Sequence, residues 1–128
     1  MPPWILILDD NEDIRCLLHD ILQRAGYGVI EARHPIEALA LFHSVRPSVV
    51  IADLQLVRKE DDGVLDKMRA IAPETKVILM SKNGGYSRSG QLGGSSDRLL
   101  SMPFRNQILL ETVTELLQQL PQGCSSDS

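Results

Sequence analysis

The sequence predicts an α/β fold of the doubly wound class, a five-stranded parallel sheet with helices on both faces. Short aliphatic runs that recur along the 128 residues are typical of strands buried in a parallel sheet. Between them lie segments with apolar residues at three- and four-residue steps, the pattern of an amphipathic helix. Because parallel neighbours need long crossover connections, this alternation favours a parallel sheet.

The first strand and the first helix are predicted before residue 27. The run over residues 5–8 is short and partly β-branched, as in a buried strand. The apolar residues that follow share one helical face, and Asn11 or Asp13 can cap the start of this helix. Gly26 can end it in a left-handed conformation. The face consists of Ile14, Leu17, Leu18, Ile21, Leu22 and Ala25.

The middle of the chain repeats the alternation. Residues 29–32 predict a weaker second strand, and Pro35 suits the first turn of a helix that ends at Pro47. Residues 49–52 predict a third strand, which Asp53 follows directly. The order strand, helix, strand therefore continues without interruption.

A polar loop is predicted after the third strand. It runs through Asp61 and Asp62 to Gly63, where a helix over residues 64–71 begins. Residues 77–80 form another aliphatic run and predict the fourth strand.

The last part of the chain predicts one more strand and one more helix. Residues 83–96 are rich in glycine and serine, and residues 98–101 predict a short fifth strand. Apolar residues between 108 and 120 predict the final helix. We therefore expect one domain over residues 1–121 and a flexible tail over residues 122–128.

Composition excludes several classes of protein. The 13 basic and 17 acidic side chains give a net charge of −4, which disfavours a dedicated nucleic-acid binder. No apolar run approaches the roughly 20 residues that cross a bilayer, and the first residues lack the features of a signal peptide. Cys16 and Cys124 form no metal-spaced cluster, and both are expected to be reduced. We expect a cytoplasmic domain without membrane insertion.

Polar side chains follow the predicted strands where each one ends. Asp9 and Asp10 follow the first strand, Asp53 the third, Ser81 the fourth, and Met102-Pro103 the fifth. Ligands of doubly wound folds bind beyond the carboxyl ends of the strands. Each residue alone has a simpler explanation as a helix cap or turn residue. Capping does not require all of them at one edge, so their joint placement favours a binding site.

Clustered carboxylates repel one another, and a divalent cation offsets that repulsion. All-oxygen ligation with open water positions suits Mg²⁺ better than zinc. A carboxylate beside Mg²⁺ can act as a nucleophile toward a phosphoryl group and form an aspartyl phosphate. Ser81 would then donate a hydrogen bond to the transferred group.

With these motifs the chain resembles the receiver domains of bacterial two-component response regulators. The resemblance runs from Trp4 to about residue 120 and rests on residues 5–12, residues 49–54, the strand ending in Ser81, and Pro103-Phe104. It implies a flavodoxin-like fold and a place in phosphorelay signalling.

The resemblance also implies a role for each site residue. Asp53 would be the phosphoacceptor, Asp10 would bind Mg²⁺ directly, and Asp9 would bind it through water. The backbone carbonyl of Gln55 would complete the protein ligands, and Ser81 would be the switch hydroxyl. The donor would be a histidine kinase or phosphotransfer protein, with an unidentified protein target downstream.

Three positions depart from the family pattern near the site. Met102 replaces the lysine before Pro103, and a thioether supplies no charged donor. The lost hydrogen bond, worth about 1.5–3 kcal/mol, is expected to weaken the coupling of phosphorylation to conformational change without abolishing Mg²⁺ binding. Lys82 either partly replaces the missing amine or remains a solvated surface lysine. Leu99 stands where the family has an aromatic switch residue.

Two segments depart as well. Val57 replaces the usual proline after Asp53, and Gly63 falls two residues late. Residues 83–96, which hold the fourth helix in the family, contain five glycines. Since each costs about 1 kcal/mol in a helix relative to alanine, we expect that helix to be short, frayed or absent.

Three kinds of function stay open. The leading hypothesis is a stand-alone receiver module in phosphorelay signalling, not an enzyme. The alternative is a degenerate receiver that binds a protein partner without phosphorylation, and Mg²⁺-dependent labelling of Asp53 separates the two. A small phosphatase or nucleotide-binding enzyme ranks last, because the sequence has neither a G-x-x-x-x-G-K-[ST] loop nor a G-x-G-x-x-G turn after a strand.

Overall fold

Five parallel strands form one sheet in the computed structural model, which describes residues 3–60, 63–81 and 98–118. The strand order is β2-β1-β3-β4-β5, so the direction of winding reverses between β1 and β3. This order confirms the predicted doubly wound sheet. The strands are β1 (Trp4–Leu8), β2 (Gly28–Ala32), β3 (Val49–Asp53), β4 (Lys76–Ser81) and β5 (Arg98–Ser101).

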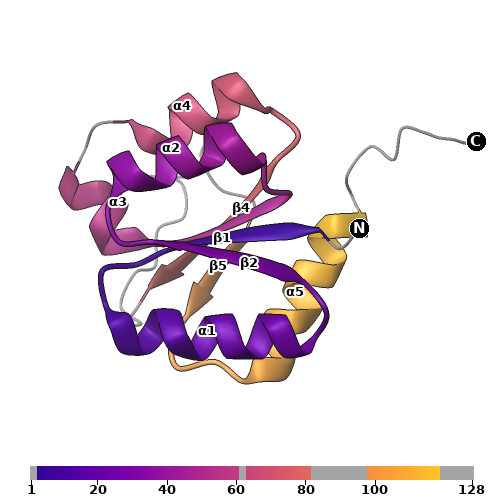
Figure 1. The fold of residues 1–128 in the computed structure, drawn as a ribbon. Coiled ribbons are helices and arrows are strands. Elements are labelled where there is room, and N and C mark those ends of the chain that lie inside the picture. The colour runs from indigo at the N-terminus through magenta and orange to yellow at the C-terminus, as the bar shows by residue number, and fades with distance from the viewer. Residues whose placement is uncertain (1–2, 61–62, 82–97, 119–128) are drawn as a thin grey trace, which may run out of the picture.

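Helices cover both faces of the sheet, as Figure 1 shows. The helices α1 (Glu12–Arg24) and α5 (Asn106–Gln118) lie on one face. The helices α2 (Pro35–Val45), α3 (Leu54–Glu60) and α4 (Val64–Ile71) lie on the other. The three-layer arrangement confirms the sequence prediction for the described part of the chain.

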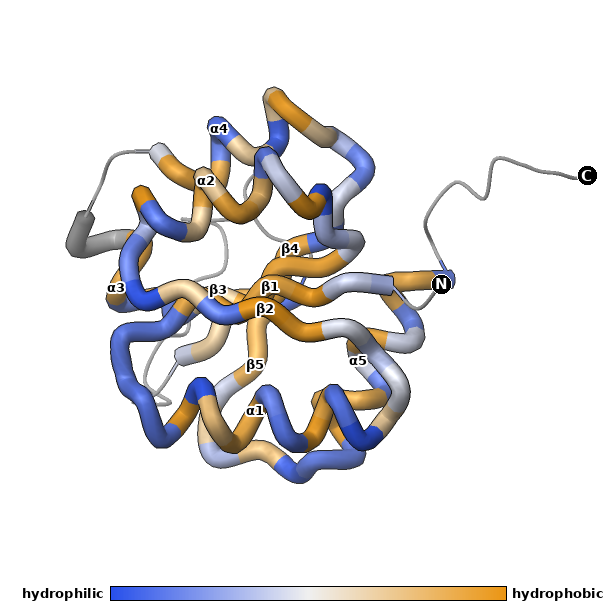
Figure 2. The backbone as a smooth tube through the Cα atoms, viewed as in Figure 1, coloured by the Kyte–Doolittle hydropathy of each residue, from blue (hydrophilic) through white to orange (hydrophobic). Residues whose placement is uncertain are grey.

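The apolar core is divided by the sheet into two clusters. Side chains alternate between the faces along each strand, so Leu6 joins one cluster while Ile5 and Ile7 join the other. The first cluster contains Phe42 of α2, the bulkiest of the fully buried side chains. Figure 2 shows hydrophobic colouring concentrated along the central strands. This two-sided burial fixes the described strands relative to one another.

A side-chain cap at its start and a left-handed glycine after its end bound the helix α1. The Asn11 side chain accepts a hydrogen bond of 3.1 Å from the backbone amide of Ile14, so Asn11 and not Asp13 caps the helix. Gly26 follows the helix with a φ of +100°, which confirms its predicted left-handed conformation.

The segment directly after β3 differs from the sequence prediction. We expected a polar loop, whereas the structure places the helix α3 over Leu54–Glu60. Leu54 and Leu56 are buried against the first core cluster, and this burial stabilises a helix that is only seven residues long. A helical repeat is hard to recognise over so few residues, so the sequence pattern missed it.

Several sequence predictions lie outside the described residues, among them the loop at residues 61–62 and the expectation for Cys124. The weak helix over residues 83–96, the tail over residues 122–128 and the role of Lys82 also lie outside them. Within the described residues, no helix is both long enough and apolar enough to cross a membrane.

Candidate functional site

Two of the predicted acidic residues lie at the ends of neighbouring strands, since Asp9 directly follows β1 and Asp53 is the last residue of β3. Leu8 of β1 is the register partner of Ala52 of β3, so Asp9 and Asp53, the next residue of each chain segment, lie at the same level. The winding direction reverses at this point of the sheet, where doubly wound folds bind their ligands. The topology therefore brings the two carboxylates together, as the sequence predicts.

Asp10 completes an acidic cluster with Asp9 and Asp53. One carboxylate oxygen from each of the three residues lies within 4.8 Å of those of the other two. Asp9 and Asp53 are buried, with 0% and 3% of their surface exposed, whereas Asp10 is exposed. The cluster therefore has two oxygens fixed in the protein and one at the solvent boundary.

Backbone amides orient the two buried carboxylates. Oδ1 of Asp9 accepts a hydrogen bond of 2.9 Å from the amide of Asn11, and Oδ1 of Asp53 accepts one of 3.3 Å from the amide of Gln55. A carboxylate has two oxygens and about four lone-pair sites, so each can accept from an amide and still offer an oxygen to a cation.

The donor set fits a magnesium ion. Hard divalent cations prefer oxygen ligands, and Mg²⁺ is usually held by one or two carboxylates with several retained waters. The three carboxylates supply only oxygen, and the exposed position of Asp10 leaves room for water. The residues present therefore suit Mg²⁺ better than zinc, which favours nitrogen and sulfur ligands.

Gln55 lies in the first turn of α3, two residues after Asp53, and its side chain is exposed. Its backbone amide donates a hydrogen bond to Asp53. In an α-helix, the backbone carbonyl of a residue in the first turn accepts a hydrogen bond from the amide four residues later. A carbonyl oxygen has two lone pairs, so the Gln55 carbonyl remains a predicted fourth ligand with one of them engaged in the helix.

Ser81 is the last residue of β4 and is 3% exposed. Asp53 is the register partner of Met80, so Ser81 lies one position beyond Asp53 on the adjacent strand. Ser81 thus lies at the same edge of the sheet as the carboxylates, and its role as the switch hydroxyl stays a prediction.

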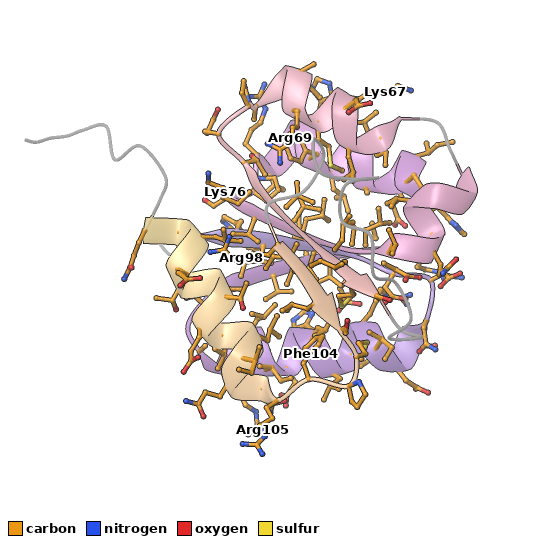
Figure 3. The ribbon with its side chains drawn as sticks, turned by 180° about the vertical axis from the view of Figure 1, so that it is seen from behind. Lys67, Arg69, Lys76, Arg98, Phe104 and Arg105 are labelled. Atoms are coloured by element: carbon orange, nitrogen blue, oxygen red, sulfur yellow. The ribbon has the colours of Figure 1, made fainter. Side chains whose placement is uncertain are left out.

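Met102 and Pro103 follow β5 at this edge. Met102 is half-buried and packs against the core cluster that includes side chains of α1 and α5, and the bond to the exposed Pro103 is a cis peptide. Phe104, labelled in Figure 3 near the start of α5, packs against the same cluster. The thioether of Met102, which lies among apolar side chains, thus occupies the position where the receiver-domain pattern has a lysine. Leu99 packs against the opposite cluster.

Arg15 is a further residue near the site and is not among the predicted site residues. It is 8% exposed, and its Nη1 donates a hydrogen bond of 2.8 Å to the backbone carbonyl of Asp9. Its spacing was an available signal, because Arg15 falls three residues before Leu18 and seven before Leu22 in the buried stripe of α1.

Comparison with known proteins shows the family of the chain. The family model of the response regulator receiver domain matches residues 5–114. The chain therefore belongs to the response regulator receiver domain family.

Individual relatives agree with this assignment. The chain is 29% identical over 129 residues to the response regulator MprA of Mycobacterium sp. (strain KMS), covering 100% of this chain and 56% of that protein. It is 31% identical over 80 residues to sporulation initiation phosphotransferase F of Bacillus subtilis (strain 168), covering 62% of this chain and 64% of that protein. The chain thus spans about half the length of the MprA-type regulators that it matches.

Solved structures show the same fold. A CheY-like receiver domain protein from Methanospirillum hungatei JF-1 is 27% identical, with a TM-score of 0.82 over 93% of this chain and 96% of that one. Chemotaxis protein CheY4 of Vibrio cholerae, at 24% identity, has a TM-score of 0.77 over 91% of this chain and 99% of that one.

Proposed function

We propose that this receiver domain accepts a phosphoryl group on the carboxylate of Asp53. The observation that carries the proposal is the cluster of Asp9, Asp10 and Asp53, whose oxygens lie within 4.8 Å of one another at the switch point of the sheet. Membership of the receiver family supports it. The proposed domain comprises residues 1–121.

The phosphoryl donor is a histidine kinase or a phosphotransfer protein. An Asp53 oxygen attacks the phosphorus of a phosphohistidine, the O–P bond forms as the N–P bond breaks, and the released imidazole nitrogen takes up a proton. Mg²⁺, when bound, neutralises the negative charge of the phosphoryl group and the carboxylates. Asp9, Asp10, Asp53 and the Gln55 carbonyl would hold it.

Ser81 donates a hydrogen bond to the transferred group, and Met102 leaves that group without the lysine contact that the family pattern has. Lys82 follows Ser81 in the sequence and is the candidate for a replacement cation. The domain acts in the cytoplasm as a signalling module, not as an enzyme with turnover, and passes its state to a protein target without contacting nucleic acid.

Phosphoryl uptake from acetyl phosphate tests the proposal. The intact mass is measured after incubation with and without Mg²⁺, for the wild type and for Asp53→Asn. A single phosphoryl adduct that requires both Mg²⁺ and Asp53 supports the proposal. If no adduct forms under conditions that label an ordinary receiver domain, the chain is a binding module that acts without phosphorylation.

A further inference from the structure

We propose that Arg15 is a positioning residue for the magnesium site, because it fixes the peptide unit that joins Asp9 to Asp10. This inference rests on the function proposed above. Arg15 belongs to α1 and reaches the end of β1, where Nη1 bonds the Asp9 carbonyl at 2.8 Å in a buried contact.

The backbone of Asp9 is held at both of its polar groups. Its amide donates a hydrogen bond of 3.1 Å to the carbonyl of Ala32 on β2, and its carbonyl accepts from Arg15. The carboxylate is oriented separately, by the amide of Asn11 at 2.9 Å. Of these three contacts, the one from Arg15 is the one that a side-chain substitution can remove.

The contact to the Asp9 carbonyl also affects Asp10. The carbonyl of Asp9 and the amide of Asp10 belong to one planar peptide unit. A donor that holds the carbonyl therefore fixes the plane, and with it the Cα atom from which the Asp10 side chain projects. Partners outside the ligand shell orient metal ligands in this way, and their loss typically weakens metal affinity 10- to 100-fold.

Arg15 is itself held by a network with β2. Its Nε donates a hydrogen bond of 3.2 Å to Oε1 of Glu31, and Nδ1 of His19 bonds Oε2 of the same carboxylate. The side chain of Arg15 is 10% exposed, that of Glu31 30% and that of His19 32%. The network is therefore largely shielded from water. Glu31 also offsets the positive charge of Arg15. The main contribution of Arg15 to the magnesium site is therefore the position that it gives to the Asp9 carbonyl.

Whether loss of Arg15 weakens or strengthens Mg²⁺ binding separates a positioning role from a purely electrostatic one. Removing a cation near an acidic site makes the local field more negative, so a purely electrostatic role predicts tighter Mg²⁺ binding in its absence. Loss of positioning predicts weaker binding. One titration therefore distinguishes the two roles.

The test compares Arg15→Met with Arg24→Met. Arg24 lies on the same helix, pairs with Asp20 at 2.9 Å on an exposed face, and changes the net charge by the same amount when replaced. Mg²⁺ affinity is measured by calorimetric titration at a temperature where circular dichroism shows each variant folded. We expect Arg15→Met to weaken Mg²⁺ binding about tenfold or more. Arg24→Met should bind as the wild type does.

Two conservative variants complete the design. Arg15→Lys should bind Mg²⁺ with intermediate affinity, because an ammonium group cannot contact the Asp9 carbonyl and Glu31 with the fixed fork of a guanidinium. Glu31→Gln should weaken binding less than Arg15→Met does. If Arg15→Met fails to fold, these two variants carry the test, and wild-type affinity in both overturns the proposal.

Other outcomes are equally decisive. Unchanged or tighter binding by folded Arg15→Met overturns the positioning role, and a lowered melting temperature with unchanged affinity assigns Arg15 to stability alone. Absence of Mg²⁺ binding in the wild type contradicts the magnesium site of the proposed function itself and removes this inference with it. Absence of Mg²⁺ binding is measured on the wild type alone, without any Arg15 variant. Failure of the proposed function is therefore distinguishable from failure of the positioning role of Arg15.

Discussion

The backbone amide of Met102 donates a hydrogen bond of 2.8 Å to the carbonyl of Ser81, which ties the turn after β5 to the end of β4. The backbone at position 102 therefore lies beside the residue that carries the predicted switch hydroxyl. The Met102 side chain instead packs against an apolar cluster. The backbone of Met102 therefore lies close to the site, while its half-buried side chain packs against the core.

Replacing Met102 by lysine should strengthen the coupling of phosphorylation to conformation. A charged hydrogen bond to the phosphoryl group contributes about 1.5–3 kcal/mol. We expect Met102→Lys to increase the difference in unfolding free energy between phosphorylated and unphosphorylated protein by an amount in this range. Mg²⁺ affinity should change little, because it depends on the carboxylates. Met102→Leu is the control, and equal behaviour of the two variants would contradict the prediction.

Replacing Asp53 by asparagine should stabilise the metal-free protein. The three carboxylates lie within 4.8 Å of one another, so removing one charge relieves repulsion. Urea unfolding in EDTA should show a gain of about 1 kcal/mol for Asp53→Asn, near the lower end of what Coulomb's law gives at this separation. Asp66→Asn, at an exposed carboxylate in α4, is the control and should show no gain. A loss of stability in Asp53→Asn would argue against an unfavourable cluster.

Magnesium should stabilise the wild-type protein by mass action. At a free Mg²⁺ concentration ten times the Kd, the unfolding free energy should rise by about 1.4 kcal/mol. Asp53→Asn should gain clearly less at the same concentration, because it offers one carboxylate fewer. Thermal melts at several Mg²⁺ concentrations measure both. An identical shift in the two proteins would place the stabilising ion elsewhere.

Asn11 offers a way to separate helix stability from the site. Its side chain caps α1, whereas its backbone amide bonds Asp9. Asn11→Ala should therefore lower the unfolding free energy by about 1 kcal/mol and leave Mg²⁺ affinity unchanged, because alanine keeps the amide. Asn11→Ser, which restores a capping oxygen, should regain most of the stability. A large loss of Mg²⁺ affinity in Asn11→Ala would show that the cap itself orients the site.

The strands and the acidic edge could be predicted from sequence because both depend on short-range patterns. Aliphatic runs such as residues 49–52 are buried on both faces of the sheet, and a residue directly after such a run must lie at the carboxyl edge. The positions of Asp9 and Asp53 follow from this rule, and Asp10 is the next residue after Asp9. Their roles as ligands and phosphoacceptor remain predictions.

Features that depend on tertiary contacts were not predictable in the same way. The helix α3 is stabilised by burial of Leu54 and Leu56, and its seven residues are too few for a clear period. Arg15 belongs to the buried stripe of α1 although its charge assigns it to the polar face. Of its partners, Asp9 directly follows β1 and Glu31 belongs to β2. Only the folded chain brings these residues together.

The most direct test of phosphoryl acceptance locates the modified residue in the wild-type protein. After incubation with acetyl phosphate and Mg²⁺, borohydride reduces an aspartyl phosphate to homoserine, which peptide mass mapping detects without any substitution. We predict homoserine at Asp53, and only when Mg²⁺ is present during the incubation. Homoserine at Asp9 or Asp10 instead, or at no position under conditions that modify an ordinary receiver domain, would contradict the assignment of Asp53 as the acceptor.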